Sequence, residues 1–245
     1  MGWLYRLCMW LLLVFLSVLV VGPQFVEFFV TIRLWVLLAI IITGILAVWV
    51  WCERRNTRRR GHARHSEAVG LALANRHEEA RHAFTEALML YKQASHFIGQ
   101  ANTLNGLGDV EWQLQRYDVA RDFYTQALRL YTQLNNRFGQ AKALRSLGNV
   151  AREENNAEHA HDFYTQALHL YTQLGVRLGQ ADLLLNLGQL SMVANPEVAK
   201  QHLSRAAELY RDLGQQEQAR AAAKAAQELE SRRSTEGSVL DVEMD

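Results

Sequence analysis

The sequence predicts an all-α protein, with an N-terminal two-helix transmembrane hairpin followed by an α-solenoid of about four helical hairpins and a C-terminal capping helix. Three observations predict this fold. Apolar residues crowd the first 52 positions, near-identical segments recur with a 40-residue period, and only two prolines occur, Pro23 and Pro196. Because proline removes a backbone donor and clashes inside a helix, its scarcity favours a helical body.

Two apolar runs lie in the first 52 residues. The first, about residues 4–21, is long enough to cross the roughly 30 Å of a bilayer core if Arg6 extends to the headgroups. The second, about residues 34–52, has tryptophans near both ends, where indoles prefer the membrane interface. We therefore expect residues 1–52 to form a membrane anchor with two spans, joined by a short external turn from Gly22 to Arg33.

A cluster of arginines follows the second run. Its members are Arg54, Arg55, Arg58, Arg59, Arg60 and Arg64. By the positive-inside rule this side is cytoplasmic, so we expect a multi-pass protein of the bacterial inner membrane with its remaining residues in the cytoplasm. We assign residues 53–65 as a basic juxtamembrane segment. Since the arginines directly follow a span, we expect them to attract anionic lipid rather than nucleic acid.

The first run also has the basic start and apolar stretch of a secretory signal peptide. No small-x-small cleavage site occurs around the sequence SVLVVGPQ, so a retained span is the preferred interpretation and cleavage is the alternative. The second run and its arginines set the orientation in either case.

The segment DFYTQALRLYTQL at residues 122–134 recurs as DFYTQALHLYTQL at residues 162–174. Three longer units begin with the same GQA motif, at Gly99, Gly139 and Gly179. Within each unit, apolar residues recur at three and four positions, which is the spacing of one helix face. The polar connections are short, so each unit is predicted to be a helical hairpin that buries its apolar face by stacking on its neighbours.

The residues copied between units are small, aliphatic or aromatic, and we predict that they form the core. They are Leu107, Gly108, Ala120, Tyr124 and Ala127, repeated as Leu147, Gly148, Ala160, Tyr164 and Ala167. In this order they resemble the tetratricopeptide repeat. The resemblance covers about residues 64–230, with a degenerate copy at 77–94, and implies a TPR-like α-solenoid, which we assign to residues 66–230. The period of forty instead of thirty-four is expected to lengthen the second helix, and Glu111 and Ala151 replace the family's usual aromatic residue.

One amphipathic helix follows the last unit, in the sequence EQARAAAKAAQELESRR. Its face of Ala219, Ala222, Ala226 and Leu229 is predicted to cap the stack. Residues 231–245 are short, polar and acidic, and we expect a flexible tail.

The sequence contains no phosphate-loop, nucleophile-elbow or zinc-hydrolase motif, so we predict no catalytic residue, no cofactor and no metal site. The two cysteines, Cys8 and Cys52, provide no disulfide framework. His62 and His65 lie three residues apart without a third ligand. The chain is therefore not expected to be an enzyme.

The resemblance implies that a partner contacts the first helix of each hairpin, along a concave groove. Carried over unit by unit, the contact positions are Asn102, Asn105, Asp109, Trp112 and Gln113, then Lys142, Arg145, Asn149, Arg152 and Glu153, then Asp182, Leu185, Gln189, Met192 and Val193. An extended peptide or helix with an acidic part beside the second unit and an apolar end beside the third is complementary to this set. Alternatively, Leu185 and Met192 pack against the capping helix, and the other positions are ordinary solvated surface.

These features predict a membrane-anchored scaffold or adaptor that binds a protein or peptide partner and no nucleic acid. The layout is also similar to that of the HemY family, membrane proteins linked to tetrapyrrole metabolism, although the similarity is architectural only. A non-catalytic subunit of a membrane complex is a further alternative. Neither predicted span has an ionisable residue in its core, which disfavours a transport pathway.

Overall fold

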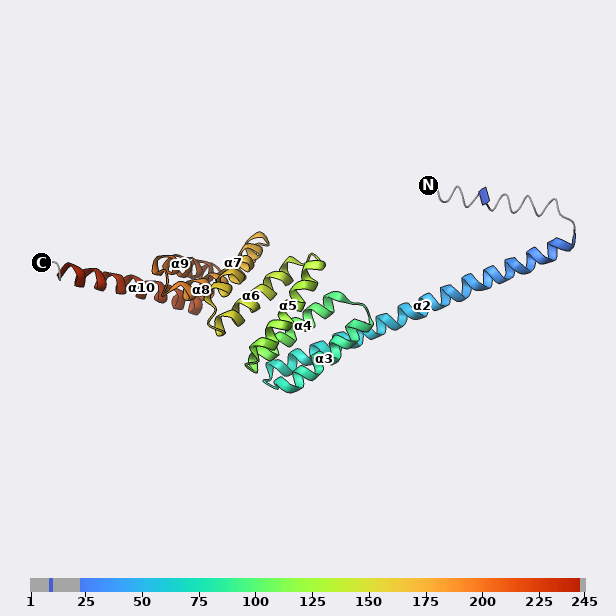
Figure 1. Cartoon of the computed structure of the whole chain (residues 1–245), viewed down its shortest axis with the longest axis horizontal. Coiled ribbons are helices and arrows are strands. Elements are labelled where there is room, and N and C mark those ends of the chain that lie inside the picture. Colours follow the sequence, from blue (N-terminus) through green and yellow to red (C-terminus); the bar gives the residue numbers. More distant parts are fainter. Residues whose placement is uncertain (1–8, 11–22, 243–245) are drawn as a thin grey trace. The chain divides into compact units, whose positions relative to one another are not determined.

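The computed structural model describes residues 9–10 and 23–242 of the chain. Within these residues it contains nine long helices, α2 to α10, and no strand, so the predicted all-α class is confirmed for the described part (Figure 1). The chain divides into two compact units, Met1–Asn56 and Thr57–Asp245.

Helix α2 (Pro23–Leu73) begins at a proline, whose fixed φ and missing N–H suit the first turn of a helix. Its part from Trp35 to Leu73 is the one helix in the described ranges that is long and apolar enough to cross a membrane. The large apolar side chains between Trp35 and Trp51 are exposed within the chain itself.

The structure does not support the predicted two-helix hairpin, since only this one long apolar helix occurs among the described residues. The first expected span, at 4–21, lies outside those residues apart from Met9 and Trp10. The turn expected up to Arg33 is helical from Pro23 onward. No proline follows until position 196, so nothing in the sequence ends the helix before it has passed through the basic segment 53–65.

The second unit is an array of antiparallel helix pairs. Its elements after α2 are α3 (His77–Gln93), α4 (Phe97–Gln113), α5 (Tyr117–Gln133), α6 (Arg137–Glu153), α7 (Ala157–Gln173), α8 (Arg177–Ser191), α9 (Pro196–Asp212) and α10 (Gln216–Val242). The last turns of α2 pack on α3, so the array holds four hairpins, and α10 packs on α9 (Figure 1). The helical repeat array is thus as predicted.

Nearly all connections in the array end the preceding helix in the same way. A central residue adopts positive φ, at Asn75, Ser95, Gln115, Asn135, Asn155, Gly175 and Gly214. The next residue's N–H then bonds to a carbonyl five residues earlier, as from Asn156 to Ala151 at 2.8 Å. This is the Schellman motif, which satisfies carbonyls at the helix end.

The regular connections divide each repeat evenly. Helices α4, α5, α6 and α7 all have 17 residues, and three residues join each to the next. Both helices of a unit are equally long, so the structure does not show the extra residues of the period confined to the second helix. The α8–α9 connection differs: it lacks a positive φ, and Asn195 caps α9 immediately before Pro196.

The repeated tyrosines are core residues, as predicted: Tyr124 is 3% exposed and Tyr164 is 0% exposed. Each ring lies directly on the backbone of the paired helix at a glycine. A Cβ on Gly108 or Gly148 would lie 2.5 Å from the ring of Tyr124 or Tyr164, respectively. Glycine is therefore required for this approach of the two helices.

The capping helix behaves as expected where its side chains are described. The four residues predicted to face the stack are all buried: Ala219, Ala222, Ala226 and Leu229. Helix α10 continues to Val242, so it includes much of the segment 231–245 that was expected to form a tail.

Candidate partner-binding groove

A cavity of about 450 Å³ opens between the end of α2, α4 and α6. Its lining residues are His65, Val69, Ala72, Leu73, Asn75, His77, Phe84, Asn102, Gly106, Asp109, Val110, Gln113 and Lys142. We call this cavity the first-repeat groove. It combines apolar side chains with amide, carboxylate, imidazole and ammonium groups, which is the usual composition of a site for a ligand with both kinds of surface.

Gly106 gives the first-repeat groove its depth. A Cβ at this position would lie 2.7 Å from the Phe84 ring, so a side chain here would collide with the ring beneath it. Phe84 is itself only 2% exposed and packs with Ala68 and Val110. The floor of the groove is therefore the backbone of α4 above a fixed aromatic ring.

Asp109 is the acidic group of this groove, and two neighbours hold it in place. Its Oδ1 accepts a hydrogen bond from the Tyr124 hydroxyl at 2.8 Å, and its Oδ2 accepts one from Asn105 Nδ2 at 3.2 Å. Desolvation by the surrounding helices raises the pKa of the Asp109 carboxyl, although the charge of Lys142 acts in the opposite direction. Burial likewise raises the pKa of the Tyr124 hydroxyl, which stays a donor.

The same tyrosine-to-acceptor bond recurs along the array. Tyr164 donates to Asn149 at 2.8 Å, and Tyr210 donates to Asp182 at 2.6 Å. Tyr131 donates to Asn102 at 2.8 Å across two adjacent helices. Burial raises the pKa of Tyr131 and Tyr164 to about 12. Several predicted partner contacts are thus held in fixed orientations by neutral hydroxyls from the second helices.

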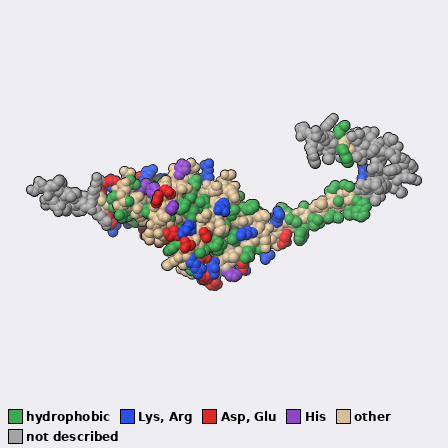
Figure 2. Space-filling model, in the orientation of Figure 1, with side chains coloured by type: hydrophobic (Ala, Val, Ile, Leu, Met, Phe, Trp, Pro, Cys, Tyr) green, Lys and Arg blue, Asp and Glu red, His purple; other side chains and the backbone are tan. Residues whose placement is uncertain are grey.

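The predicted cations of the second repeat each have an acidic neighbour. Arg145 Nη1 lies 3.4 Å from Asp182 Oδ2, and Arg152 Nη2 lies 3.0 Å from Glu153 Oε1. Lys142 lines the first-repeat groove together with Asp109. The face seen in Figure 2 likewise shows Lys and Arg side chains interspersed with Asp and Glu over the array. The middle of the array is therefore mixed in charge, which weakens the expected attraction for an acidic partner.

One predicted position, Asn105, is buried, and another, Trp112, is half-buried. Asn105 is 0% exposed, and Trp112 packs beside the cluster that contains Tyr124 and Ala120. Neither Asn105 Oδ1 nor Trp112 Nε1 has a hydrogen-bond partner.

The third repeat uses its apolar positions internally. Leu185 and Met192 pack against a cluster that includes Ala226 and Leu229 of α10, so the alternative interpretation describes these two residues. Val193, in the α8–α9 connection, is 94% exposed, and Gln189 is also exposed. Val193 is therefore available to an apolar partner beside the third repeat. Leu185 and Met192 are not, because they already pack against α10.

Sequence reasoning missed the contribution of α2 to the groove. Val69 is 40% exposed and Leu73 is 82% exposed, both along the cavity. The register contained the signal: residues 57–73 precede α4 by one period of forty, so they occupy the place of a first helix. The arginines at the start of this stretch led to the assignment of its residues up to 65 as a juxtamembrane segment instead of a repeat helix.

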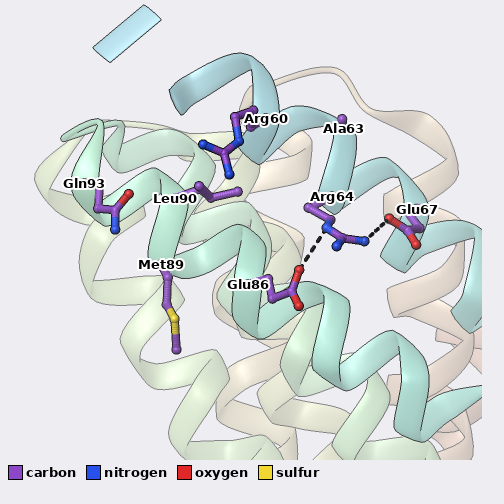
Figure 3. Close-up of a pocket in the computed structure, with 8 residues that line it drawn as sticks. All are labelled: Arg60, Ala63, Arg64, Glu67, Glu86, Met89, Leu90 and Gln93. Atoms are coloured by element: carbon purple, nitrogen blue, oxygen red, sulfur yellow. Dashed lines mark hydrogen bonds and ion pairs between the residues drawn. The ribbon is translucent and has the colours of Figure 1, made fainter. Parts of the chain in front are cut away.

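A second hollow, of about 560 Å³, lies between α2 and α3 and is drawn in Figure 3. Arg64 crosses it, with Nη1 2.7 Å from Glu67 Oε2 and Nε 2.8 Å from Glu86 Oε2. One of the arginines assigned to membrane topology is thus engaged within the array. Arg58, Arg59 and Arg60 are exposed.

The histidines of α2 meet a third histidine that the sequence did not place beside them. The ring centroids of His62 and His96 are 5.5 Å apart, with Tyr91 between α2 and the start of α4. His65 bonds to Thr103 at 3.0 Å through Nδ1. No group of three metal-ligating side chains suited to an ion occurs in the ranges that the structure describes.

Two family models, both described as tetratricopeptide repeat, match residues 99–173 and 203–232. Over these residues the chain is similar to the tetratricopeptide repeat. The first match spans α4 to α7, the two hairpins with the most similar sequences, and the second joins the end of α9 to α10. Such repeats are generally non-catalytic interaction scaffolds, and nothing in the described site indicates catalysis.

Many solved structures have a similar fold, and two of them are BtubC and RapI. BtubC (BKLC) from P. vanneervenii is 15% identical with a TM-score of 0.53, over 76% of this chain and 92% of that one. The apo form of RapI is 12% identical with a TM-score of 0.63, over 74% of this chain and 51% of RapI, so the match spans about half of RapI. At these identities the likeness concerns the fold alone. No curated protein sequence matches the chain.

Proposed function

We propose that this protein is a membrane-anchored scaffold whose tetratricopeptide repeats bind an extended segment of a protein partner in the cytoplasm. The first-repeat groove carries the proposal, because it is a concave site with an apolar floor and fixed polar groups on its rim. The long apolar part of α2, exposed within the chain, supports the anchor. The exposed Arg58, Arg59 and Arg60 that follow it support a cytoplasmic array near anionic lipid.

The groove favours a partner with an apolar anchor residue. Val69 and Leu73 offer exposed aliphatic surface, and the Gly106 backbone leaves room above Phe84. Asn102 and Lys142 stand at the rim, where they can bond to the carbonyls or a carboxylate of an extended chain. The apolar anchor is therefore proposed beside the first repeat instead of the third, with one acidic side chain near Lys142.

A matched pair of substitutions tests the groove. Val69, in the groove, and Val119, on the outer start of α5, are 40% and 41% exposed. Affinity capture of the full chain from detergent extract should lose specific partners in Val69→Glu and keep them in Val119→Glu. Identical partner lists from both variants and the native protein would contradict the groove.

Membrane placement has a separate test. The native protein should stay in the pellet after carbonate extraction, and protease added to right-side-out vesicles should spare the repeat array. Release by carbonate would contradict the anchor. Ready digestion of the array in intact vesicles would contradict the cytoplasmic orientation.

A further inference from the structure

Large apolar side chains stand in solvent along one edge of the repeat array. This edge consists of the connections from a second helix to the next first helix, at residues 94–98, 134–138, 174–178 and 213–215, and we call it the loop edge. Phe97 is 53% exposed, Phe138 52%, Leu174 40% and Leu178 42%. Exposed aromatic and aliphatic groups in successive repeats are a feature of interaction surfaces.

Contacts between neighbouring connections show that the loop edge is continuous. Arg137 Nη1 lies 3.4 Å from Gln173 Oε1, and the rings of Phe138 and Tyr171 are 6.0 Å apart. Arg177 forms an ion pair with Asp212, next to the following connection. The connections at 134–138 and 174–178 are therefore each in contact with the second helix of the hairpin that follows.

The loop edge carries little negative charge at three of its four connections. Residues 94–98, 134–138 and 174–178 contain no Asp or Glu, and Arg137 and Arg177 are exposed there. The fourth connection, 213–215, follows Asp212, which forms an ion pair with Arg177. On the opposite edge, acidic side chains such as Glu78 and Asp118 form ion pairs with neighbouring arginines. A negatively charged surface is therefore compatible with the loop edge at its first three connections.

The chain enters the array at the loop edge. His62 of α2 lies against His96 of the first connection, so the exposed arginines at 58–60 stand at the same end of the helices. In sequence, they follow the apolar stretch ending at Trp51 within a few residues. In sequence, the apolar stretch is therefore nearer to the loop edge than to the opposite edge.

We propose that the loop edge is a membrane-contact surface for a bilayer that contains anionic lipid. Phe97, Phe138 and Leu178 enter the interfacial layer, and Arg137 and the arginines at 58–60 lie among the headgroup phosphates. The inference rests on the proposed membrane anchor and adds that the array lies with this edge against the bilayer.

The test compares two labelled positions on the full chain. Cys8→Ser with Cys52→Ser removes the native thiols, and Leu178→Cys or Val119→Cys then receives an environment-sensitive nitrobenzoxadiazole dye. Leu178 and Val119 are 42% and 41% exposed, on opposite edges, so labelling disturbs the core at neither. The protein is placed one copy per nanodisc, made of phosphatidylcholine with or without phosphatidylserine.

With phosphatidylserine, the dye at position 178 should shift to shorter wavelength and show several-fold more quenching by doxyl-labelled lipid than the dye at position 119. Without phosphatidylserine, or in high salt, the difference should shrink. Equal, weak quenching at both positions in a nanodisc that retains the protein would overturn the membrane-contact surface and leave the anchor standing. A shift seen in crowded vesicles but absent from single-copy nanodiscs would assign the edge to a second copy instead. Failure of the chain to enter nanodiscs would overturn both proposals.

Discussion

The Tyr164 hydroxyl donates a 2.8 Å hydrogen bond to the amide oxygen of Asn149, and forty residues earlier the Tyr124 hydroxyl donates one of equal length to the carboxylate of Asp109. The same hydrogen bond from tyrosine is thus made to a neutral amide in one repeat and to a carboxylate in another. Desolvation raises the pKa of Asp109, so the surrounding protein disfavours its charge. The amide carries no such penalty.

We therefore expect Asp109→Asn to raise the melting temperature at pH 7, by about 1–3 °C because solvent at the open side screens the effect. The folded pKa lies above the unfolded value, so Asp109 contributes its full stability only below the unfolded pKa and loses it as pH rises through the folded pKa. The advantage of the variant should disappear in acid. The reverse change, Asn149→Asp, should lower the melting temperature at pH 7. A loss of stability in Asp109→Asn would show that attraction to Lys142 outweighs desolvation.

Close helix packing predicts opposite effects for two Gly→Ala changes. Gly148→Ala places a Cβ 2.5 Å from the Tyr164 ring, and we expect it to cost about 1–3 kcal/mol through overpacking. Gly70, on the exposed side of α2, has no atom within 4 Å of the new Cβ, so Gly70→Ala should gain about 0.5–1 kcal/mol through helix propensity. Thermal unfolding in detergent, followed by circular dichroism, measures both. Equal effects of the two changes would contradict the close-packing explanation.

The positive-φ positions offer a third prediction. Gln115 has φ 58°, a conformation that costs an L-residue about 1–2 kcal/mol. Gln115→Gly should stabilise the array by about 0.5–1 kcal/mol, because the greater freedom of glycine in the unfolded chain offsets part of that gain. Gly175, at φ 67° in the equivalent place, is the control: Gly175→Ala should destabilise by about 1 kcal/mol. Unfolding midpoints in denaturant test the pair, and a neutral or destabilising Gln115→Gly would contradict the assignment.

These positions also explain what the sequence could predict. Apolar spacing placed the hairpins and their core correctly, because a residue such as Ala127 or Tyr164 must recur on one helix face to be buried. The helix ends were harder to place. Gly and, more weakly, Asn mark positive φ by residue type, but Ser95 and Gln115 do not. Residue types at the connections therefore did not show that each repeat is divided into two helices of equal length.

The candidate site was less predictable for a different reason. Whether Asn102 is a free groove amide or the acceptor of Tyr131 depends on the distance between two helices, which no local pattern encodes. The same holds for Arg145 and Asp182, which lie 37 residues apart in sequence. On α2, the arginines before His62 have the composition of a juxtamembrane segment, although the same turns complete the first hairpin.

His96 makes the stability of the repeat array depend on pH. Its Nδ1 caps α4 by accepting a hydrogen bond from the Gly99 N–H at 3.2 Å, a role that requires this nitrogen to be unprotonated. The groups facing it are the His62 ring, the Tyr91 ring and the positive charge of Arg58. Burial lowers the pKa of His96, and the charges of His62 and Arg58 lower it further.

Because the folded pKa of His96 lies below the unfolded value of 6.5, the unfolded chain binds more protons between the two. Stability is therefore full above about pH 6.5 and falls as pH drops through the folded pKa. His96→Asn should flatten this dependence while keeping the cap, since Asn136 caps α6 through the same bond to Gly139, at 2.9 Å. His96→Ala should instead lose about 1 kcal/mol above pH 7, where the cap is intact in the native protein.

Melting temperatures of the native protein and both variants, measured from pH 5 to pH 8, separate these outcomes. The curves of His96→Asn and the native protein should converge above pH 7 and diverge in acid, where the native protein is the less stable. If the slope persists unchanged in His96→Asn, the acid sensitivity belongs to His65 or His202, because burial lowers the pKa of both.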